Sequence, residues 1–276
     1  MMMIMNGVIA VEPPMTDLPT VLITGASSGI GATYADRFAR RGHPLVLVAR
    51  DKARLDALAA RLRDETGVAV DVIQADLTKA VDIEVVEARL REDVRIGILV
   101  NNAGVSVAGR FDHQTPTDLE RLVAVNTTAV LRLAHAVSAR FAASGDGAII
   151  NIGSAVSLMP EFGQTVYGAT KAFVLYLSQG LAFELGPKGV YVQAVLPAAT
   201  GTEIWSRSGA DPAKLPPMME VGELVDAALV GFDRREPVTI PPLHDDRQWD
   251  AYQAARHVML PGFGQDTAAP RYRTGS

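Results

Sequence analysis

The residues best suited to proton transfer lie in the segment Tyr167–Lys171, which reads YGATK. On a helix, a tyrosine and a lysine four positions apart lie on one face, one turn apart. A free phenol has a pKa of about 10 and transfers protons poorly at neutral pH. A fixed ammonium nearby stabilises the phenolate and lowers that pKa. The pair therefore predicts a general acid or base.

Ser154 can bring a third polar group to the same pocket. It closely follows the apolar run at 148–152, which predicts a buried strand, so its hydroxyl lies just beyond a strand end. Serine, tyrosine and lysine together can polarise a carbonyl group and transfer a proton to its oxygen. A tyrosine–lysine pair alone is a weaker signal, since such pairs are common on exposed helix surfaces.

Length and composition indicate an ordinary globular α/β protein. The chain has 276 residues, of which 48% are hydrophobic and 21% charged, as in typical globular domains. A net charge of −5 gives no electrostatic reason to expect a nucleic acid or an anionic membrane as partner. The chain has no cysteine, which excludes disulfides and a thiol nucleophile, and its scattered histidines predict no metal site.

A glycine-rich turn predicts a dinucleotide site near the N-terminus. The apolar run 21–23 predicts a strand, which leads into TGASSGIG at 24–31 and then a helical pattern up to Arg40. Glycines let backbone amides approach a pyrophosphate, and the helix N-terminus adds partial positive charge. The predicted contacts are Gly25, Ser27, Ser28, Gly29, Ile30 and Gly31.

The end of the second predicted strand, at 44–49, indicates which dinucleotide binds. Many dinucleotide folds place an acid there to bind the ribose 2′-hydroxyl, whereas this chain has Ala49 followed by Arg50. No carboxylate repels a 2′-phosphate, and the guanidinium can pair with one. We therefore predict NADP(H) as the preferred cofactor and NAD(H) as the lesser alternative. The other interpretation of Arg50 is a solvated surface residue.

Polar residues after the next two predicted strands extend this site. Asp76 and Leu77 follow the strand at 68–74, at the edge where ligands collect in an open parallel sheet. Asp76 can accept a hydrogen bond from adenine or cap the following helix. The segment 101–104, NNAG, follows the strand at 96–100 and suits either a ligand-facing turn or an ordinary loop.

One long helix is predicted over 117–141, with Asn126 inside it. Asparagine has no propensity advantage within a helix, so Asn126 either faces solvent or holds a water or a backbone bend. Apolar neighbours on both sides make full exposure the weaker alternative.

Five motifs together resemble the short-chain dehydrogenase/reductase family. They are TGASSGIG, NNAG, Asn126, Ser154 and YGATK, in the family's order and spacing over about 20–205. The resemblance agrees with the strand and helix pattern in implying a doubly wound, seven-stranded parallel Rossmann fold in a single domain. It implies an NAD(P)(H)-dependent enzyme that transfers hydride between nicotinamide and a carbonyl or secondary alcohol.

The resemblance also implies residue roles. Tyr167 would be the general acid/base, and Lys171 would lower its pKa and bind the nicotinamide ribose. Ser154 would hydrogen-bond the substrate oxygen, and Asn126 would hold a water in a proton relay. Further cofactor contacts would come from Asp76, Leu77, Asn102, Ala103, Gly104, Pro197 and Thr202. Ala198 departs from the Pro-Gly pair that is common in the family at 197–198.

The mixed segment at 203–220 predicts a mobile lid over the substrate, because it contains several prolines and a glycine. Four residues could form an apolar wall that favours a hydrophobic ketone, aldehyde or secondary alcohol: Met159, Phe162, Ile204 and Trp205. The alternative is that these side chains belong to the core or to an interface.

We expect one catalytic domain at 18–262, between a flexible extension at 1–17 and a tail at 263–276. No stretch of about 18 uncharged apolar residues is present, which favours a cytoplasmic protein with no membrane partner. The resemblance implies a homodimer or homotetramer and a small-molecule substrate. Two other classes stay open: an NADP-binding sensor or scaffold without catalysis, and a dinucleotide-fold methyltransferase.

Overall fold

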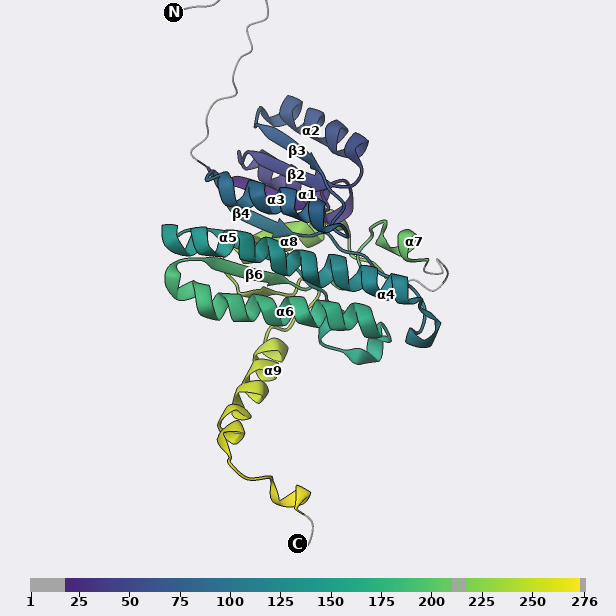
Figure 1. The fold of residues 1–276 in the computed structure, drawn as a ribbon, viewed down its shortest axis with the longest axis vertical. Helices are drawn as coiled ribbons and strands as arrows, with labels where there is room; N and C mark the ends of the chain where they lie inside the picture. The colour runs from purple at the N-terminus through teal and green to yellow at the C-terminus, as the bar shows by residue number, and fades with distance from the viewer. Residues whose placement is uncertain (1–17, 210–212, 214–216, 274–276) are drawn as a thin grey trace, which may run out of the picture. The chain divides into compact units, whose positions relative to one another are not determined.

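The computed structural model describes residues 18–209, 213 and 217–273. Its centre is one sheet of seven parallel strands in the order β3-β2-β1-β4-β5-β6-β7 (Figure 1). The strands are β1 (Thr20–Thr24), β2 (Leu45–Ala49), β3 (Val70–Gln74), β4 (Ile96–Asn101), β5 (Ala148–Ile152), β6 (Tyr191–Val195) and β7 (Val238–Thr239). The order reverses between β1 and β4, which is where a doubly wound sheet binds its ligand. The predicted fold class is confirmed.

The inner strands are apolar because both faces of the sheet are covered. β1, β2, β5 and β6 are buried at every position, as expected for parallel strands between two helical layers. β3 lies at one edge and is fully buried only at Val70. The apolar runs in the sequence therefore correctly marked the strands that carry the site at their carboxyl ends.

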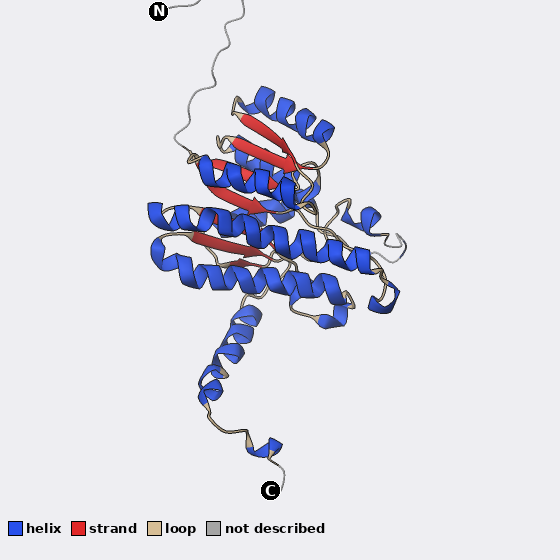
Figure 2. Ribbon diagram, in the orientation of Figure 1, coloured by secondary structure: helices blue, strands red, loops and turns tan. Residues whose placement is uncertain are grey.

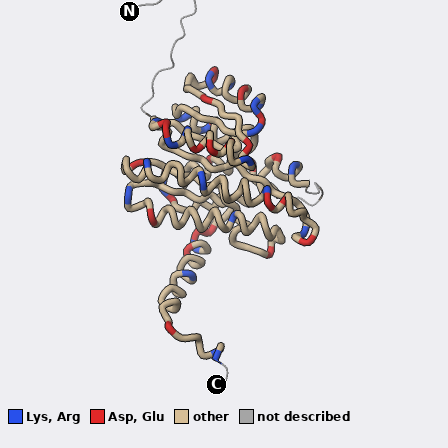
Figure 3. The backbone as a smooth tube through the Cα atoms, viewed as in Figure 1, with Lys and Arg blue, Asp and Glu red and all other residues tan. Residues whose placement is uncertain are grey.

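Helices cover both faces of the sheet (Figure 2). On one face the core includes Phe38, Leu55 and Val225, from α1, α2 and α8. On the other it includes Val86, Val137 and Leu185, from α3, α5 and α6. The helices are α1 (Gly29–Arg40), α2 (Lys52–Thr66), α3 (Ala80–Glu92), α4 (Pro116–Val123), α5 (Val130–Ser144), α6 (Thr165–Leu185), α7 (Ile204–Ser208), α8 (Val221–Asp233) and α9 (Arg247–Val258). Basic and acidic residues are interspersed along the helices (Figure 3).

The helix predicted over 117–141 is not continuous. A π-helical turn at Ala124–Ala129 separates α4 from α5 and contains Asn126. Wide turns of this kind are often found at functional sites. The prediction of a regular helix was therefore wrong at Asn126, and of the open alternatives solvent exposure is excluded because Asn126 is buried.

The stretch Pro116–Ser144 as a whole is long and apolar enough to cross a membrane by length and composition. Half of its most apolar window is buried inside the fold. Core helices pass the same test, so this stretch is weak support for a membrane span.

Two regions differ from the predicted boundaries. The lid predicted at 203–220 begins with the short helix α7, and its residues 210–212 and 214–216 lie outside the described part of the chain. The chain divides into two compact units at 241/242. The second unit contains α9 and two 3-10 turns, Leu260–Gly264 and Pro270–Tyr272. The assignment of residues up to 262 to the catalytic domain stays a prediction, and the predicted extension at 1–17 lies outside the described residues.

Candidate active site

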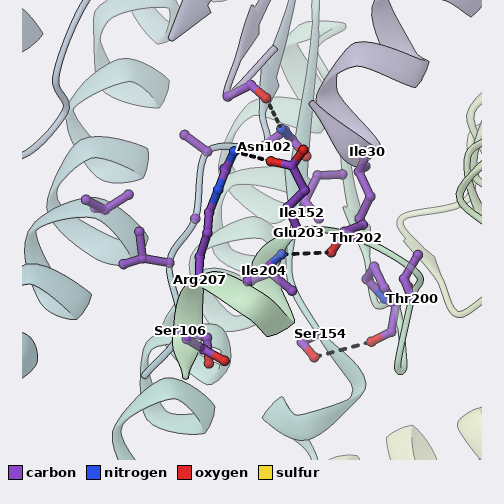
Figure 4. Close-up of a pocket in the computed structure, with 18 of the residues that line it drawn as sticks. Ile30, Asn102, Ser106, Ile152, Ser154, Thr200, Thr202, Glu203, Ile204 and Arg207 are labelled. Atoms are coloured by element: carbon purple, nitrogen blue, oxygen red, sulfur yellow. Dashed lines mark hydrogen bonds and ion pairs between the residues drawn. The ribbon is translucent and has the colours of Figure 1, made fainter. Parts of the chain in front are cut away.

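One cavity of about 840 Å³ at the carboxyl ends of the strands gathers nearly all the predicted site residues. Every predicted cofactor, catalytic and substrate residue lines it except Gly31, Asn126 and Met159. Figure 4 shows part of this lining, including Asn102, Ser154 and Thr202. Residues far apart in sequence therefore meet in one place, as the motif pattern predicted.

The glycine turn after β1 is packed so tightly that side chains would not fit. Gly25 has φ +65°, a left-handed conformation that favours glycine. A Cβ at Gly31 would lie 2.4 Å from both the Gly25 carbonyl oxygen and the Asn102 Nδ2. Gly31 thus packs against Gly25 and Asn102 within the turn and does not line the cavity. Thr202 lines the cavity next to Gly29: a Cβ added at Gly29 would lie 3.2 Å from the Thr202 Cγ2.

Thr24 ties the glycine turn to the NNAG segment. Its hydroxyl accepts hydrogen bonds from the Asn102 and Ala103 amides, both at 3.0 Å. The Asn102 side chain donates back to the Thr24 carbonyl at 2.8 Å. The sequence analysis missed Thr24. The available signal was its position as the last residue of a strand that adjoins a second ligand-facing loop.

The N-terminus of α1 opens toward the cavity and suits an anion. Ser28 caps the helix without a side-chain hydrogen bond to the first turn, and no acid lies in that turn. The first amides of a helix lack intrahelical acceptors and attract phosphate. The Ser27 and Ser28 hydroxyls lie beside these amides.

Arg50 and Asp76 face the cavity from the ends of β2 and β3. Within the described residues, no carboxylate pairs with the Arg50 guanidinium, so it is available for a ligand anion. Asp76 Oδ1 accepts hydrogen bonds from the Thr78 amide at 3.0 Å and the Thr78 hydroxyl at 2.8 Å. Burial opposes ionisation of Asp76, but the Thr78 hydrogen bonds and the nearby Arg50 outweigh it and lower the pKa. Asp76 therefore forms a turn with Thr78 and does not cap α3, whose N-cap is Lys79. Its adenine contact stays a prediction.

Hydrogen bonds between strands and helix fix the catalytic helix α6 against the sheet. Asn101 and Asn151 are paired in register on β4 and β5, and their side chains hydrogen-bond at 3.0 Å. Asn151 Nδ2 then donates to the Ser178 Oγ of α6 at 2.9 Å. Ser178 lies on the same helix as Tyr167 and Lys171. This buried chain orients that helix relative to Ser154, which follows β5.

Ser154 and Tyr167 present their hydroxyls to the same point. Ser154 is buried, and its Oγ donates to the Pro197 carbonyl at 3.2 Å (Figure 4). Burial raises the pKa of Tyr167 to about 12, and a hydrogen bond with Ser154 acts in the opposite direction. The phenol therefore stays protonated at neutral pH and is ready to donate.

Lys171 is buried next to the phenol, but its charge does not outweigh the burial that raises the pKa of Tyr167. Its Nζ lies 5.8 Å from the centre of the Tyr167 ring and donates to the Ile152 carbonyl at 2.8 Å. Burial lowers the pKa of Lys171 itself to about 8. The pKa of Tyr167 is therefore not shifted toward neutrality as the Tyr-Lys spacing predicted, because desolvation of the phenol dominates.

Asn126 is fully buried and holds the loop that follows NNAG. Its Oδ1 accepts from the Val105 amide and its Nδ2 donates to the Val105 carbonyl, both at 2.9 Å. Nδ2 also donates to Thr170 Oγ1 at 3.1 Å. Asn126 thus clamps one wall of the cavity to α6, and its predicted water relay stays a prediction.

The far end of the cavity has apolar walls that include Phe162, Ile204 and Trp205. Trp205 is held by a hydrogen bond from its Nε1 to the Thr200 carbonyl at 2.8 Å. Met159 does not line the cavity and is 52% exposed, because it precedes a 3-10 turn on the surface. Its assignment to the substrate wall was wrong.

Sequence reasoning also missed several polar residues of the lining. They are Ser106, Arg121, Gln164, Thr200, Glu203, Arg207 and Ser208. Glu203 links the lid helix to α2, because it accepts hydrogen bonds from Arg54 Nη1 at 2.9 and 3.0 Å and pairs with Arg207 one turn along (Figure 4). None of these residues belongs to a motif, so only their arrangement in the fold identifies them.

Comparison with known families agrees with this geometry. The sequence profile of short chain dehydrogenases matches residues 19–213. Among curated proteins, the very-long-chain 3-oxoacyl-CoA reductase of Anas platyrhynchos is 36% identical over 188 residues, covering 66% of this chain and 60% of that protein. The 17-beta-hydroxysteroid dehydrogenase type 3 of Homo sapiens is 35% identical over 183 residues. The chain therefore spans about 60% of the length of these relatives.

Two solved structures are much more similar. A short-chain dehydrogenase from Sphingobium yanoikuyae in complex with NADPH is 68% identical, with a TM-score of 0.91, covering 93% of this chain and all of that one. The bulky-bulky ketone specific alcohol dehydrogenase from Comamonas testosteroni is 62% identical, with a TM-score of 0.87, covering 93% of this chain and 99% of that one.

Proposed function

This chain belongs to the short-chain dehydrogenase/reductase family, and from that premise we propose that it is an NADP(H)-dependent oxidoreductase of bulky ketones and the corresponding secondary alcohols. The observation that carries the proposal is the convergence of Ser154, Tyr167 and Lys171 in one cavity with a glycine-rich dinucleotide turn. The substrate class is supported by the apolar walls of that cavity and by the similarity to the Comamonas testosteroni alcohol dehydrogenase.

The residues fit NADP(H). The glycine turn leaves a cradle next to the N-terminus of α1, where a pyrophosphate is stabilised. Arg50 lines the cavity at the end of β2, has no carboxylate partner within the described residues, and would hold the ribose 2′-phosphate. The complex of the Sphingobium yanoikuyae protein with NADPH supports the same choice. When bound, the cofactor supplies the hydride.

The protein's own groups then act on the carbonyl oxygen. Ser154 and Tyr167 donate hydrogen bonds to it, and these strengthen as negative charge develops there. Tyr167 transfers its proton to that oxygen. Lys171, charged below a pH of about 8, stabilises the phenolate that remains. The presence of all three groups in one cavity disfavours the alternative of a sensor or scaffold that binds NADP without catalysis.

A panel of ketones with NADPH tests this function. We expect loss of dihydronicotinamide absorbance with ketones that carry two bulky substituents, and much slower loss with acetone. A protein that binds NADPH and reduces no ketone would instead be a sensor, and preference for acetone would contradict the bulky-ketone assignment.

Replacing Arg50 with alanine should weaken NADPH binding about 10- to 100-fold, since a charge-assisted hydrogen bond contributes about 1.5–3 kcal/mol. Binding of NADH, which lacks the 2′-phosphate, should change little. Fluorescence titration measures both affinities. Lys52→Ala is the matched control, because it removes one positive charge nearby from a side chain that pairs with Asp56 and does not line the cavity. Equal losses for the two cofactors would contradict the assignment of Arg50.

Assembly and location remain proposals. We propose a homo-oligomer, supported by the exposed apolar surface of α6, where Tyr176 and Phe183 are 80% and 83% exposed. Light scattering would measure the number of subunits. We also propose a cytoplasmic location, which fractionation of the source cells would test.

A further inference from the structure

The charged groups of the cavity lining are almost all satisfied within the protein. Asp51 accepts a hydrogen bond from the Arg54 amide at 3.0 Å, and Glu203 holds both Arg54 and Arg207. As described above, Asp76 is held by Thr78 and Lys171 donates to the sheet. Two cavity-lining guanidiniums are left without a hydrogen bond or ion pair from their side chains to any described residue, those of Arg50 and Arg121.

Arg50 is accounted for by the 2′-phosphate, but Arg121 is at a different place in the cavity. It lies on α4, one turn before Val125, which also lines the cavity and precedes Asn126. The wall near Val105 is closed from the other side by the lid helix, since the Ala108 amide donates to the Ser208 carbonyl at 2.9 Å. Arg121 therefore lies one helical turn from the wall that Asn126 holds against Val105, a wall to which no cofactor contact is assigned, and we infer that it belongs to the substrate end.

The Arg121 side chain is partly exposed, but not all of its guanidinium reaches solvent. Its Nε is buried and has no hydrogen-bond partner. A buried donor that carries charge is costly when it is left unpaired, so a ligand that pairs with it is favoured strongly. Two more polar residues of the lining, Ser106 and Gln164, make no side-chain hydrogen bond within the described part of the chain and can assist.

We propose that Arg121 binds a carboxylate of the substrate, so that the preferred substrates are oxo acids with a bulky apolar body, and hydroxy acids in the reverse direction. This inference rests on the proposed function and specifies its substrate class. The planar fork of the guanidinium matches a carboxylate with two parallel hydrogen bonds. Phe162, Ile204 and Trp205 supply the apolar surface that the body of such a substrate needs.

The test compares an aromatic oxo acid with its methyl ester, which share one carbon skeleton. For the wild type with NADPH we expect kcat/KM for the acid to exceed that for the ester by at least about 10-fold, mainly through KM. In Arg121→Met, whose side chain has a similar length and no charge, this ratio should fall to about one or below. Arg121→Lys should retain part of the preference, because a point charge replaces a fork.

Arg110→Met is the matched control, since Arg110 is exposed, pairs with Asp112 and does not line the cavity; the ratio should stay as in the wild type. A wild type that does not prefer the acid, or a preference that survives in Arg121→Met, would overturn the inference while ester reduction still supported the oxidoreductase function. If neither compound were reduced while the bulky ketones of the panel were, the inference would be overturned and the oxidoreductase function would stand; if no ketone were reduced either, that function would fail. Calorimetry tests the role of Arg121 independently of turnover, by measuring binding of the acid to the NADPH-loaded wild type and to NADPH-loaded Arg121→Met. We expect the variant to lose this binding, and equal binding to both proteins would refute the inference.

Discussion

Replacing Tyr167 with phenylalanine is expected to lower kcat for ketone reduction by about 10²–10⁴-fold, equivalent to about 3–5 kcal/mol in the activation free energy. The phenol is the donor because its pKa is raised to about 12 by burial, so it is protonated at every working pH. Removing its oxygen leaves Ser154 as the remaining hydroxyl at that point, and the developing alkoxide then has no proton source from the protein. Stopped-flow reduction at saturating NADPH measures the effect on the chemical step.

The interpretation depends on Tyr167→Phe remaining folded and able to bind NADPH. We expect both, since the variant keeps the aromatic ring and removes only a hydroxyl. Tyr176→Phe is the matched control: it makes the same change on the same helix, at a side chain that is 80% exposed, and should leave kcat within about twofold of the wild type. Turnover of Tyr167→Phe close to that of the control would show that the proton comes from another group.

The features that could be predicted from the sequence are those set by local pattern. Apolar runs located β1, β2, β4 and β5, because strands buried on both faces contain few polar residues. The turn around Gly25 and Gly31 was predictable because only glycine fits at these two positions. Five residues of the YGATK and NNAG motifs line the same cavity: Tyr167, Lys171, Asn102, Ala103 and Gly104.

The pKa of Tyr167 was not predictable, because it depends on burial. Spacing alone places an ammonium one helical turn from the phenol, which suggests a lowered pKa. In the structure Lys171 donates to the Ile152 carbonyl and lies over the ring face, and desolvation outweighs its charge. The direction of the shift is decided by the environment of the oxygen, which no local pattern records.

Residues that act through tertiary contacts were missed for a related reason. Arg121 and Glu203 belong to no motif, and each lines the cavity only because the fold brings its helix there. Met159 shows the opposite error, since its apolar side chain was assigned to the wall and lies on an exposed turn. The substrate end of the site is therefore the part that requires the fold to be known.

Replacing Lys171 with methionine is the second change with a large expected effect, about 10²–10³-fold in kcat at neutral pH. Burial lowers the pKa of Lys171 from 10.5 to about 8. The ammonium that stabilises the phenolate of Tyr167 is therefore present below pH 8 and is lost above it. In the wild type, kcat/KM for reduction should therefore be level below pH 8 and fall above it. The pKa of Tyr167, about 12, is too high to cause this break.

In Lys171→Met the rate should be low at every pH, and the fall above pH 8 should disappear.

Measurements of folding stability separate this catalytic effect from damage to the structure. Because the folded pKa of Lys171 is lower than the unfolded one, the folded state binds fewer protons between pH 8 and 10.5, and wild-type stability should rise with pH across that window. Lys171→Met should lack this rise, and at neutral pH it should be as stable as the wild type or more so, since an apolar group replaces a desolvated charge. The pH–rate profile and denaturant unfolding are measured on both proteins. If the rate of Lys171→Met still fell near pH 8, another group would be responsible for that fall, and Lys171 would have no role in the mechanism.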